Sequence, residues 1–226
     1  MFYKNANVFC GDFSFHHGAF EVVDGKFGQV MPNDVPEDAV DLQGATVIPG
    51  LIDVHSHGNS GADFSDGDYE GLQTMAAYYA SVGVTSFAPA SMTLPYETLE
   101  KAYVNAKRLV EETPAGLSVL RGIQMEGPYF SYKKRGAQNP DYLKEPDFAG
   151  FKALQEGSGG LIRIVDVAPE LPGAEEFVRQ AKELCTVSVA HTDADYDHAK
   201  AAFDAGATHL THLYNAMPAI HHRNPG

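Results

Sequence analysis

Hydrophobic and polar positions alternate in two different rhythms along the chain. In residues 1 to 48, short apolar runs such as Asn7 to Phe9 and Ala19 to Val23 are broken by Gly, Asp, Asn and Pro. This pattern is typical of short antiparallel strands, with turns at Asp24-Gly25 and around Asn33. A few strands of this length rarely form a stable unit alone, so we expect residues 1–48 to belong to a small β domain.

From Thr46 onward, short apolar runs alternate with longer amphipathic stretches. The apolar runs predict strands at 47–54, 86–88, 117–125, 161–167, 186–190 and 209–211. The stretches between them predict helices at 71–82, 96–112, 148–156, 174–184 and 196–205. Strand–helix–strand units in regular succession favour a parallel sheet, and therefore an α/β fold.

Six predicted strands precede the last residue of the sequence, Gly226. A (β/α)8 barrel, or TIM barrel, has eight units and typically ~250 residues. We therefore expect residues 49–226 to form about six of eight βα units of a barrel, with the C-terminal units beyond Gly226. A smaller open α/β sheet that ends at Gly226 is the alternative.

The clearest local motif is an apolar strand that ends in His55-Ser56-His57. Residues i and i+2 of a strand face the same side, so both imidazoles point into one space. At the C-terminal end of a barrel strand, that space is the usual mouth of the active site. Two neutral imidazoles there suit a Zn²⁺-like ion. For this motif alone, a hydrogen-bonded pair of structural histidines is the alternative.

Three more candidate ligands follow other predicted strands. Glu126 comes directly after strand 117–125, His191 after strand 186–190 and His212 after strand 209–211. Any one of them alone is better explained as a structural or surface residue. Parallel strands, however, place their C-terminal ends on one face. Four histidines and one carboxylate on that face predict a metal site with one or two ions. If two ions bind, Glu126 could bridge them.

Charge and composition narrow the classes of partner. The formal net charge is −14, from 30 acidic and 16 basic residues. Such a surface repels nucleic acid and anionic lipid, so we expect neither as a partner. The chain has two cysteines, no signal-peptide pattern and no apolar run of ~18 residues, which favours a cytoplasmic protein.

Several motifs occur together in a characteristic order between Pro49 and Gly226. They are PGLIDVHSHG, MEGPY, RGAQNP, AHTDAD and THLYNAMPAIHHRNPG. Together they resemble the N-acetylglucosamine-6-phosphate deacetylases of the amidohydrolase superfamily. The resemblance implies a TIM barrel of the amidohydrolase type over residues 49–226, with residues 1–48 as the N-terminal part of a small β-sandwich domain. It also implies a homodimer of the full-length protein.

The resemblance implies an enzyme, a hydrolase acting on linear amides. Its reaction would be metal-dependent deacetylation of N-acetylglucosamine 6-phosphate to glucosamine 6-phosphate and acetate, in amino-sugar catabolism or cell-wall recycling. A metal-activated hydroxide would attack the acetamide carbon. Glu126, His191 and His212 would be the core metal ligands, and His55 and His57 would add a second ion. Zinc is the expected metal, with iron, manganese, cobalt or nickel as alternatives.

The resemblance also implies which residues contact the small-molecule substrate, an amino-sugar phosphate. They are Ala137, Gln138, Asn215, Ala216 and Arg223. Some relatives have His where Gln138 stands; Gln can still donate to an acetyl carbonyl, but it cannot carry the charge of an imidazolium. Arg223 and backbone N–H groups near Asn215 and Ala216 would hold the phosphate. The superfamily's general acid–base Asp ends strand eight, so we expect the catalytic residue beyond Gly226.

Two other functions stay open at this point. Another amidohydrolase, acting on a cyclic or linear amide, would often bridge its metals with a modified Lys on strand four. Strand 161–167 contains no Lys, which favours the deacetylase. A catalytically silent metal- or sugar-phosphate-binding fragment would fit a chain without the strand-eight Asp.

Overall fold

The computed structural model describes residues 1–223 and 225, and the chain divides into two compact units, Met1–Gly50 and Leu51–Gly226. In the first unit, β1 (Phe2–Phe9) and β2 (Phe15–Val23) form an antiparallel pair, and β3 (Lys26–Phe27) continues from β2 after a turn at Asp24-Gly25. Strands β4 (Val40–Asp41) and β5 (Thr46–Val47) run parallel to β1. Ala6, Val8 and Phe20 form the buried centre of this small unit.

The second unit is built on parallel strands. In chain order they are β6 (Leu51–Asp53), β9 (Val84–Phe87), β10 (Ala90–Ser91), β11 (Val119–Leu120), β12 (Ile123–Met125), β13 (Ile162–Val167), β14 (Thr186–Val189) and β15 (His209–Leu210). They pair as β11-β9-β6 and as β10-β12-β13-β14-β15. Because β10 continues from β9 and β12 from β11, successive strand positions are also neighbours in space. A short hairpin, β7 (Gly58–Asn59) and β8 (Ala62–Asp63), follows the first strand.

The five helices that connect these strands lie where the sequence pattern predicts them. They are α1 (Tyr69–Ser81), α2 (Tyr96–Glu112), α3 (Phe148–Gly157), α4 (Ala174–Ala181) and α5 (Tyr196–Ala205). Asp68, Asp147 and Asp195 cap α1, α3 and α5 by accepting N–H groups of the first turn. Helix α4 ends three residues before the predicted Leu184, whose N–H donates to Ala181 O in a closing turn. Among the described residues, no helix is both long and apolar enough to cross a bilayer.

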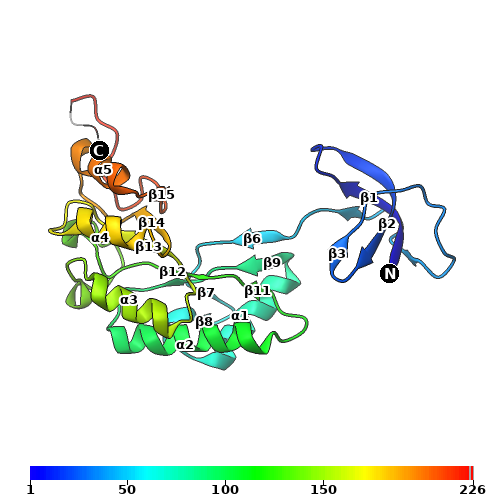
Figure 1. Cartoon of the computed structure of the whole chain (residues 1–226), viewed down its shortest axis with the longest axis horizontal. Helices are drawn as coiled ribbons and strands as arrows, with labels where there is room; N and C mark the ends of the chain where they lie inside the picture. Colours follow the sequence, from blue (N-terminus) through cyan, green and yellow to red (C-terminus); the bar gives the residue numbers. More distant parts are fainter. Residues whose placement is uncertain (224, 226) are drawn as a thin grey trace. The chain divides into compact units, whose positions relative to one another are not determined.

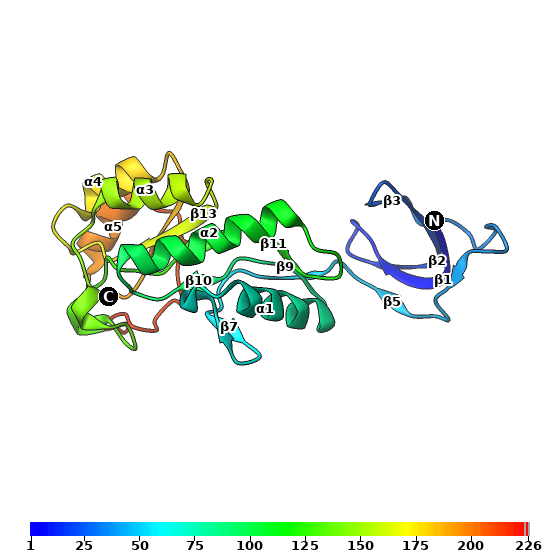
Figure 2. The same cartoon turned by 90° about the horizontal axis from the view of Figure 1, so that it is seen from below.

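The strands have an apolar outer face and a polar inner face. Helix α1 contacts β9, α2 contacts β11 and α4 contacts β14 (Figure 1, Figure 2). The outward side chains pack into the core shared with the helices; they include Ile123, Met125, Val165, Val167, Val187 and Val189. The alternate positions point inward, since successive strand residues face opposite sides, and they carry Gln124, Asp166 and Ser188.

One predicted strand is interrupted. The sequence predicts a continuous strand over 117–125, whereas the structure breaks it at Arg121-Gly122. Strand β11 pairs with β9, while β12 pairs with β10 and β13. A Cβ atom added to Gly122 would lie 2.2 Å from the side chain of Arg163, so glycine permits the close approach at this break.

Candidate metal centre

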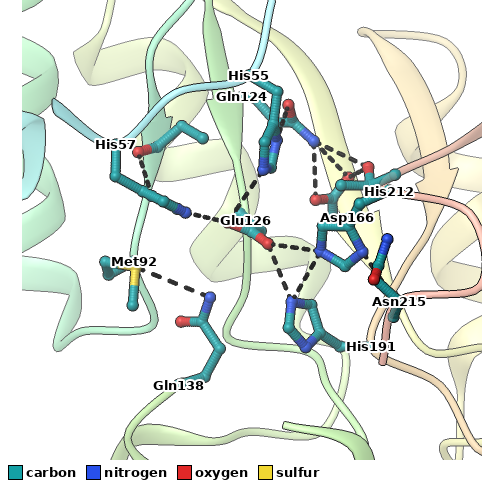
Figure 3. A network of polar contacts seen from close by, with 12 residues as sticks. His55, His57, Met92, Gln124, Glu126, Gln138, Asp166, His191, His212 and Asn215 are labelled. Carbon is teal, nitrogen blue, oxygen red and sulfur yellow. Dashed lines mark hydrogen bonds and ion pairs between the residues drawn. The ribbon is translucent and has the colours of Figure 1, made fainter. Parts of the chain in front are cut away.

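The five candidate ligands converge on one point at the C-terminal ends of the strands (Figure 3). Glu126 follows β12 and is only 1% exposed. Its Oε1 atom lies 2.9 Å from His191 Nε2 and 3.1 Å from His212 Nε2. Its Oε2 atom lies 3.0 Å from His57 Nε2 and 3.9 Å from His55 Nε2. The structure therefore brings all five sequence-predicted side chains together around one carboxylate.

Local backbone conformation turns two of these histidines toward Glu126. If β14 continued regularly, Ser188 and Ala190 would face inward and His191 would face the helices. Instead His191 has φ of 44°, and His212 has φ of 35°. Left-handed conformations of this kind cost about 1–3 kcal/mol at a residue other than glycine, and they persist where the surrounding contacts hold them. At both positions the strand ends and the imidazole reaches the shared site.

Each of the four histidines is anchored through Nδ1. The partner is an oxygen that can only accept: Ala90 O at 3.0 Å from His57, Lys134 O at 2.9 Å from His191, Asn215 O at 3.0 Å from His212, and the amide Oε1 of Gln124 at 2.8 Å from His55. Nδ1 must therefore carry the proton in every ring. In the neutral imidazole, Nε2 is then left with a lone pair, and all four Nε2 atoms face Glu126.

This arrangement fits a divalent metal ion. Four lone pairs and a carboxylate that face one another repel unless protons or a cation lie between them. His191 Nε2 and His212 Nε2 are only 3.1 Å apart. Among the described residues, none donates a hydrogen bond to the buried Oε2 atom of Glu126. Ligand atoms of His55, Glu126 and His212 all lie within 4.8 Å of one another, and imidazole with carboxylate suits Zn²⁺ and related ions.

The electrostatics of the cluster favour an ionised carboxylate. Burial opposes ionisation of Glu126, but its contacts with His191 and His57 hold its pKa well below the usual range. The close contact with the Glu126 carboxylate raises the pKa of His57. Burial lowers the pKa of His191, but the hydrogen bonds to Glu126 and to Lys134 O, together with the nearby negative charge, outweigh it, and the net shift is upward. Without a cation, these imidazoles hold protons more readily than free histidine, and a metal would displace those protons.

The predicted substrate contacts fall into two groups. Gln138 is buried, and its Oε1 atom accepts the Thr93 N–H at 2.7 Å. Its Nε2 atom, 3.9 Å from Met92 Sδ, is therefore the end of the amide that remains available to donate. Ala137, next to it, is exposed. Gln138 thus presents donors near the cluster (Figure 3).

The loop after β15 contributes through its backbone. Asn215 O holds His212, and Ala216 O accepts the Thr192 N–H at 3.1 Å. Arg223 is exposed, and its backbone N–H donates to His221 Nδ1. Within the described part of the chain, Arg223 has no part in the polar network around Glu126, whereas Asn215 is joined to it through His212.

A polar layer that the sequence pattern did not predict lies directly beneath the cluster. Gln124, Asp166, Ser188 and Thr211 are buried on the inner face and hydrogen-bonded to one another. Burial, reinforced by the charge of Glu126, raises the pKa of Asp166 to about 8. The available signal was a polar residue between two apolar ones in each of three strands, as in Ile-Gln-Met, Val-Asp-Val and Val-Ser-Val.

Residues 46–224 match the amidohydrolase family. The chain belongs to this family. Its similarity to N-acetylglucosamine-6-phosphate deacetylases, indicated by the sequence motifs, is confirmed by curated relatives. The deacetylase of Bacillus subtilis is 40% identical over 185 residues, which cover 80% of this chain and 47% of that protein. An N-acetylgalactosamine-6-phosphate deacetylase of Escherichia coli O157:H7 is 34% identical, over 91% of this chain and 54% of that protein. The chain spans about half the length of these relatives.

Solved structures confirm the predicted fold class, a barrel of the amidohydrolase type with N-terminal strands. The N-acetyl-D-glucosamine-6-phosphate deacetylase of Mycobacterium smegmatis matches with a TM-score of 0.89 and 31% identity, over 100% of this chain and 59% of that one. The corresponding enzyme of Pasteurella multocida gives a TM-score of 0.89 at 29% identity, over 100% of this chain and 60% of that one. An amidohydrolase of the cyclic-amide type is not favoured by these matches.

Proposed function

We propose that this chain carries the metal centre of an N-acetylglucosamine-6-phosphate deacetylase. The reaction is hydrolysis of the acetamide to glucosamine 6-phosphate and acetate. The observation that supports it best is the convergence of four Nε2 lone pairs on the buried carboxylate of Glu126. The names of the relatives supply the substrate class, an N-acetylated amino-sugar phosphate.

The proposed ligands divide into a core and an addition. Glu126, His191 and His212 would hold the first ion, and His55 and His57 would hold a second one that shares Glu126. We expect zinc, since imidazole and carboxylate donors suit it, with iron, manganese, cobalt or nickel as alternatives. When bound, the metal supplies Lewis acidity and lowers the pKa of water in its coordination sphere towards ~7.

The chain's own residues would bind and orient the substrate. Gln138 has its oxygen engaged by Thr93, so its Nε2 can donate to the acetyl carbonyl and stabilise negative charge that develops there. Backbone N–H groups near Asn215 and Ala216, together with the Arg223 guanidinium, would hold the phosphate. Ala137 would lie against the sugar. We assign protonation of the amine leaving group to none of the described residues.

The cellular compartment, the oligomeric state, the partners and the domain division are part of the proposal. Two free cysteines, Cys10 and Cys185, fit a reducing cytoplasm. The family resemblance favours a homodimer, and the acidic surface disfavours nucleic acid and membrane lipid as partners. Residues 1–48 would belong to a small β-sandwich domain and residues 49–226 to the metal-dependent barrel.

Acetate release tests the proposal. Zinc-loaded full-length protein would be incubated with N-acetylglucosamine 6-phosphate, its galactosamine epimer and unphosphorylated N-acetylglucosamine. We expect acetate from a phosphorylated substrate, little from the unphosphorylated sugar, and none after Glu126→Gln. Equal rates with and without the phosphate would contradict the assigned substrate class, and turnover unaffected by Glu126→Gln would contradict the assigned centre.

A further inference from the structure

A hydrogen-bonded layer of polar side chains lies inside the strands, directly beneath the proposed metal centre. It consists of Gln124, Asp166, Ser188 and Thr211, which are at most 2% exposed. Buried polar groups cost about 1–3 kcal/mol each when they lack partners, so such a layer is stable only if its members satisfy one another. Ser188 Oγ lies 2.8 Å from Thr211 Oγ1 and 3.0 Å from His209 Nδ1, which closes the far end of the layer.

The layer fixes which way the Gln124 amide points. Its Nε2 atom donates to Asp166 Oδ2 at 2.9 Å and to Thr211 Oγ1 at 2.9 Å, and it lies 3.2 Å from Asp166 Oδ1. Thr211 Oγ1 in turn donates to Asp166 Oδ1 at 2.9 Å. A 180° rotation of the amide would set Oε1 against the Asp166 carboxyl oxygens. The rotation would also break the Nε2 hydrogen bonds to Asp166 and Thr211 and would turn Nε2 toward His55.

The orientation of Gln124 determines the tautomer of His55. With Nε2 engaged below, Oε1 faces His55 Nδ1 at 2.8 Å and can only accept its proton (Figure 3). His57, His191 and His212 are anchored by backbone carbonyls, whereas His55 is anchored by a side chain that is itself held in place. Its ring is also 31% exposed, so packing alone constrains it weakly.

We propose that Gln124, locked by Asp166 and Thr211, is the positioning residue that keeps the Nε2 lone pair of His55 directed at Glu126 and thereby makes the second cation site. The inference rests on the proposed metal centre and deepens it. Partners of metal-bound histidines typically change metal affinity ~10–100-fold when they are replaced. Of the five proposed ligands, Gln124 hydrogen-bonds through its side chain to His55, so its effect on the metal would act through His55.

The test compares three variants of the full 226-residue chain with the wild type. Gln124→Leu removes the acceptor, and Gln124→Glu keeps an oxygen toward His55 while sharing a proton with Asp166. Gln155→Leu is the matched control, because Gln155 is another buried glutamine, bonded to both Ile162 N and Ile162 O from α3. Zinc titration calorimetry with metal analysis gives the number and affinity of ions. ¹⁵N NMR of the metal-free chain reports the His55 tautomer.

The wild type should bind two zinc ions and show His55 protonated at Nδ1. In Gln124→Leu the first ion should remain, the second should weaken ~10–100-fold, and the Nδ1–H signature should be lost. Gln124→Glu should restore both properties, and Gln155→Leu should lower Tm while leaving both ions. Unchanged second-ion affinity in Gln124→Leu would overturn the inference, as would an equal loss in Gln155→Leu. A wild type that binds a single ion would overturn it while leaving the proposed function in place; a wild type that binds none would overturn the proposed function itself.

Discussion

Replacing Glu126 by Gln removes the charge of the metal centre while keeping its shape. The carboxylate faces four Nε2 atoms at 2.9, 3.0, 3.1 and 3.9 Å, so all four histidines share it. In Glu126→Gln, one of the two oxygens becomes an NH₂ group, which cannot bind a cation. We therefore expect the variant to lose most of the thermal stabilisation that zinc gives the wild type.

The size of this effect follows from ligand linkage. A ligand at 100 times its Kd stabilises the folded state by about 2.7 kcal/mol. For 226 residues, an unfolding entropy of ~2.1 cal/mol/K per residue amounts to ~0.47 kcal/mol/K, so Tm should rise by about 6 °C. If Glu126→Gln weakens binding ~100-fold, as even indirect changes to a metal site can do, the same zinc concentration adds ~0.4 kcal/mol, or about 1 °C.

Thermal melts followed by circular dichroism, with zinc or with a chelator, measure both shifts. Glu156→Gln is the control, since Glu156 is an exposed residue of α3 that pairs only loosely with Lys152. It should keep the full increase in Tm. The compared quantity is the increase on adding zinc, because the loss of charge also changes the Tm of the metal-free variant. An equal increase in Glu126→Gln and wild type would refute the assignment of Glu126.

Three further results are expected. Because the folded pKa of Asp166 is about 8, well above its ordinary value, the folded metal-free chain keeps a proton that the unfolded chain releases near pH 4; this stabilisation is complete below about pH 4 and is lost as pH rises towards 8. The raised pKa values of His57 and His191 also favour the folded state more at low pH than at high pH. The free energy of unfolding, measured by urea denaturation, should therefore fall between about pH 5 and 8. The fall should be shallower in Asp166→Asn. Zinc binding at pH 7 should release protons from these imidazoles, measurable by calorimetry in two buffers of different ionisation enthalpy; a heat independent of buffer would contradict it. Gln138→Leu should lower kcat/KM by ~10²-fold or more in the active enzyme while leaving the zinc content unchanged, and a loss of zinc would show instead that Gln138 supports the metal site.

The sequence predicts some elements of this fold to the residue. Helix α2 begins directly after Pro95, which cannot continue a preceding helix, and α5 begins after the capping residue Asp195. These signals are local, so they can be read without knowledge of the fold. The break in the strand depends instead on how its two halves pair with different partners. Gly122 is a local signal of an irregularity, but it does not indicate which strand each half pairs with.

The candidate site divides in the same way. All five candidate ligands were found because each lies at or just after the C-terminal end of an apolar strand. The inward rotation of His191 and His212 was not predictable from the sequence. It depends on left-handed backbone conformations, which glycine usually adopts, and neither position is a glycine. The role of Gln124 was missed because a polar residue in a strand reveals its partners only when the inner face is known, and Asp166 lies 42 residues away along the chain.

Anomalous diffraction from zinc-loaded crystals tests the central claim most directly. Data collected above and below the zinc absorption edge locate the ion independently of any assumption about its ligands. The account predicts an anomalous peak ~2.0–2.2 Å from a Glu126 oxygen, His191 Nε2 and His212 Nε2. An ion bound elsewhere, with Glu126 still in direct contact with its histidines, would contradict it.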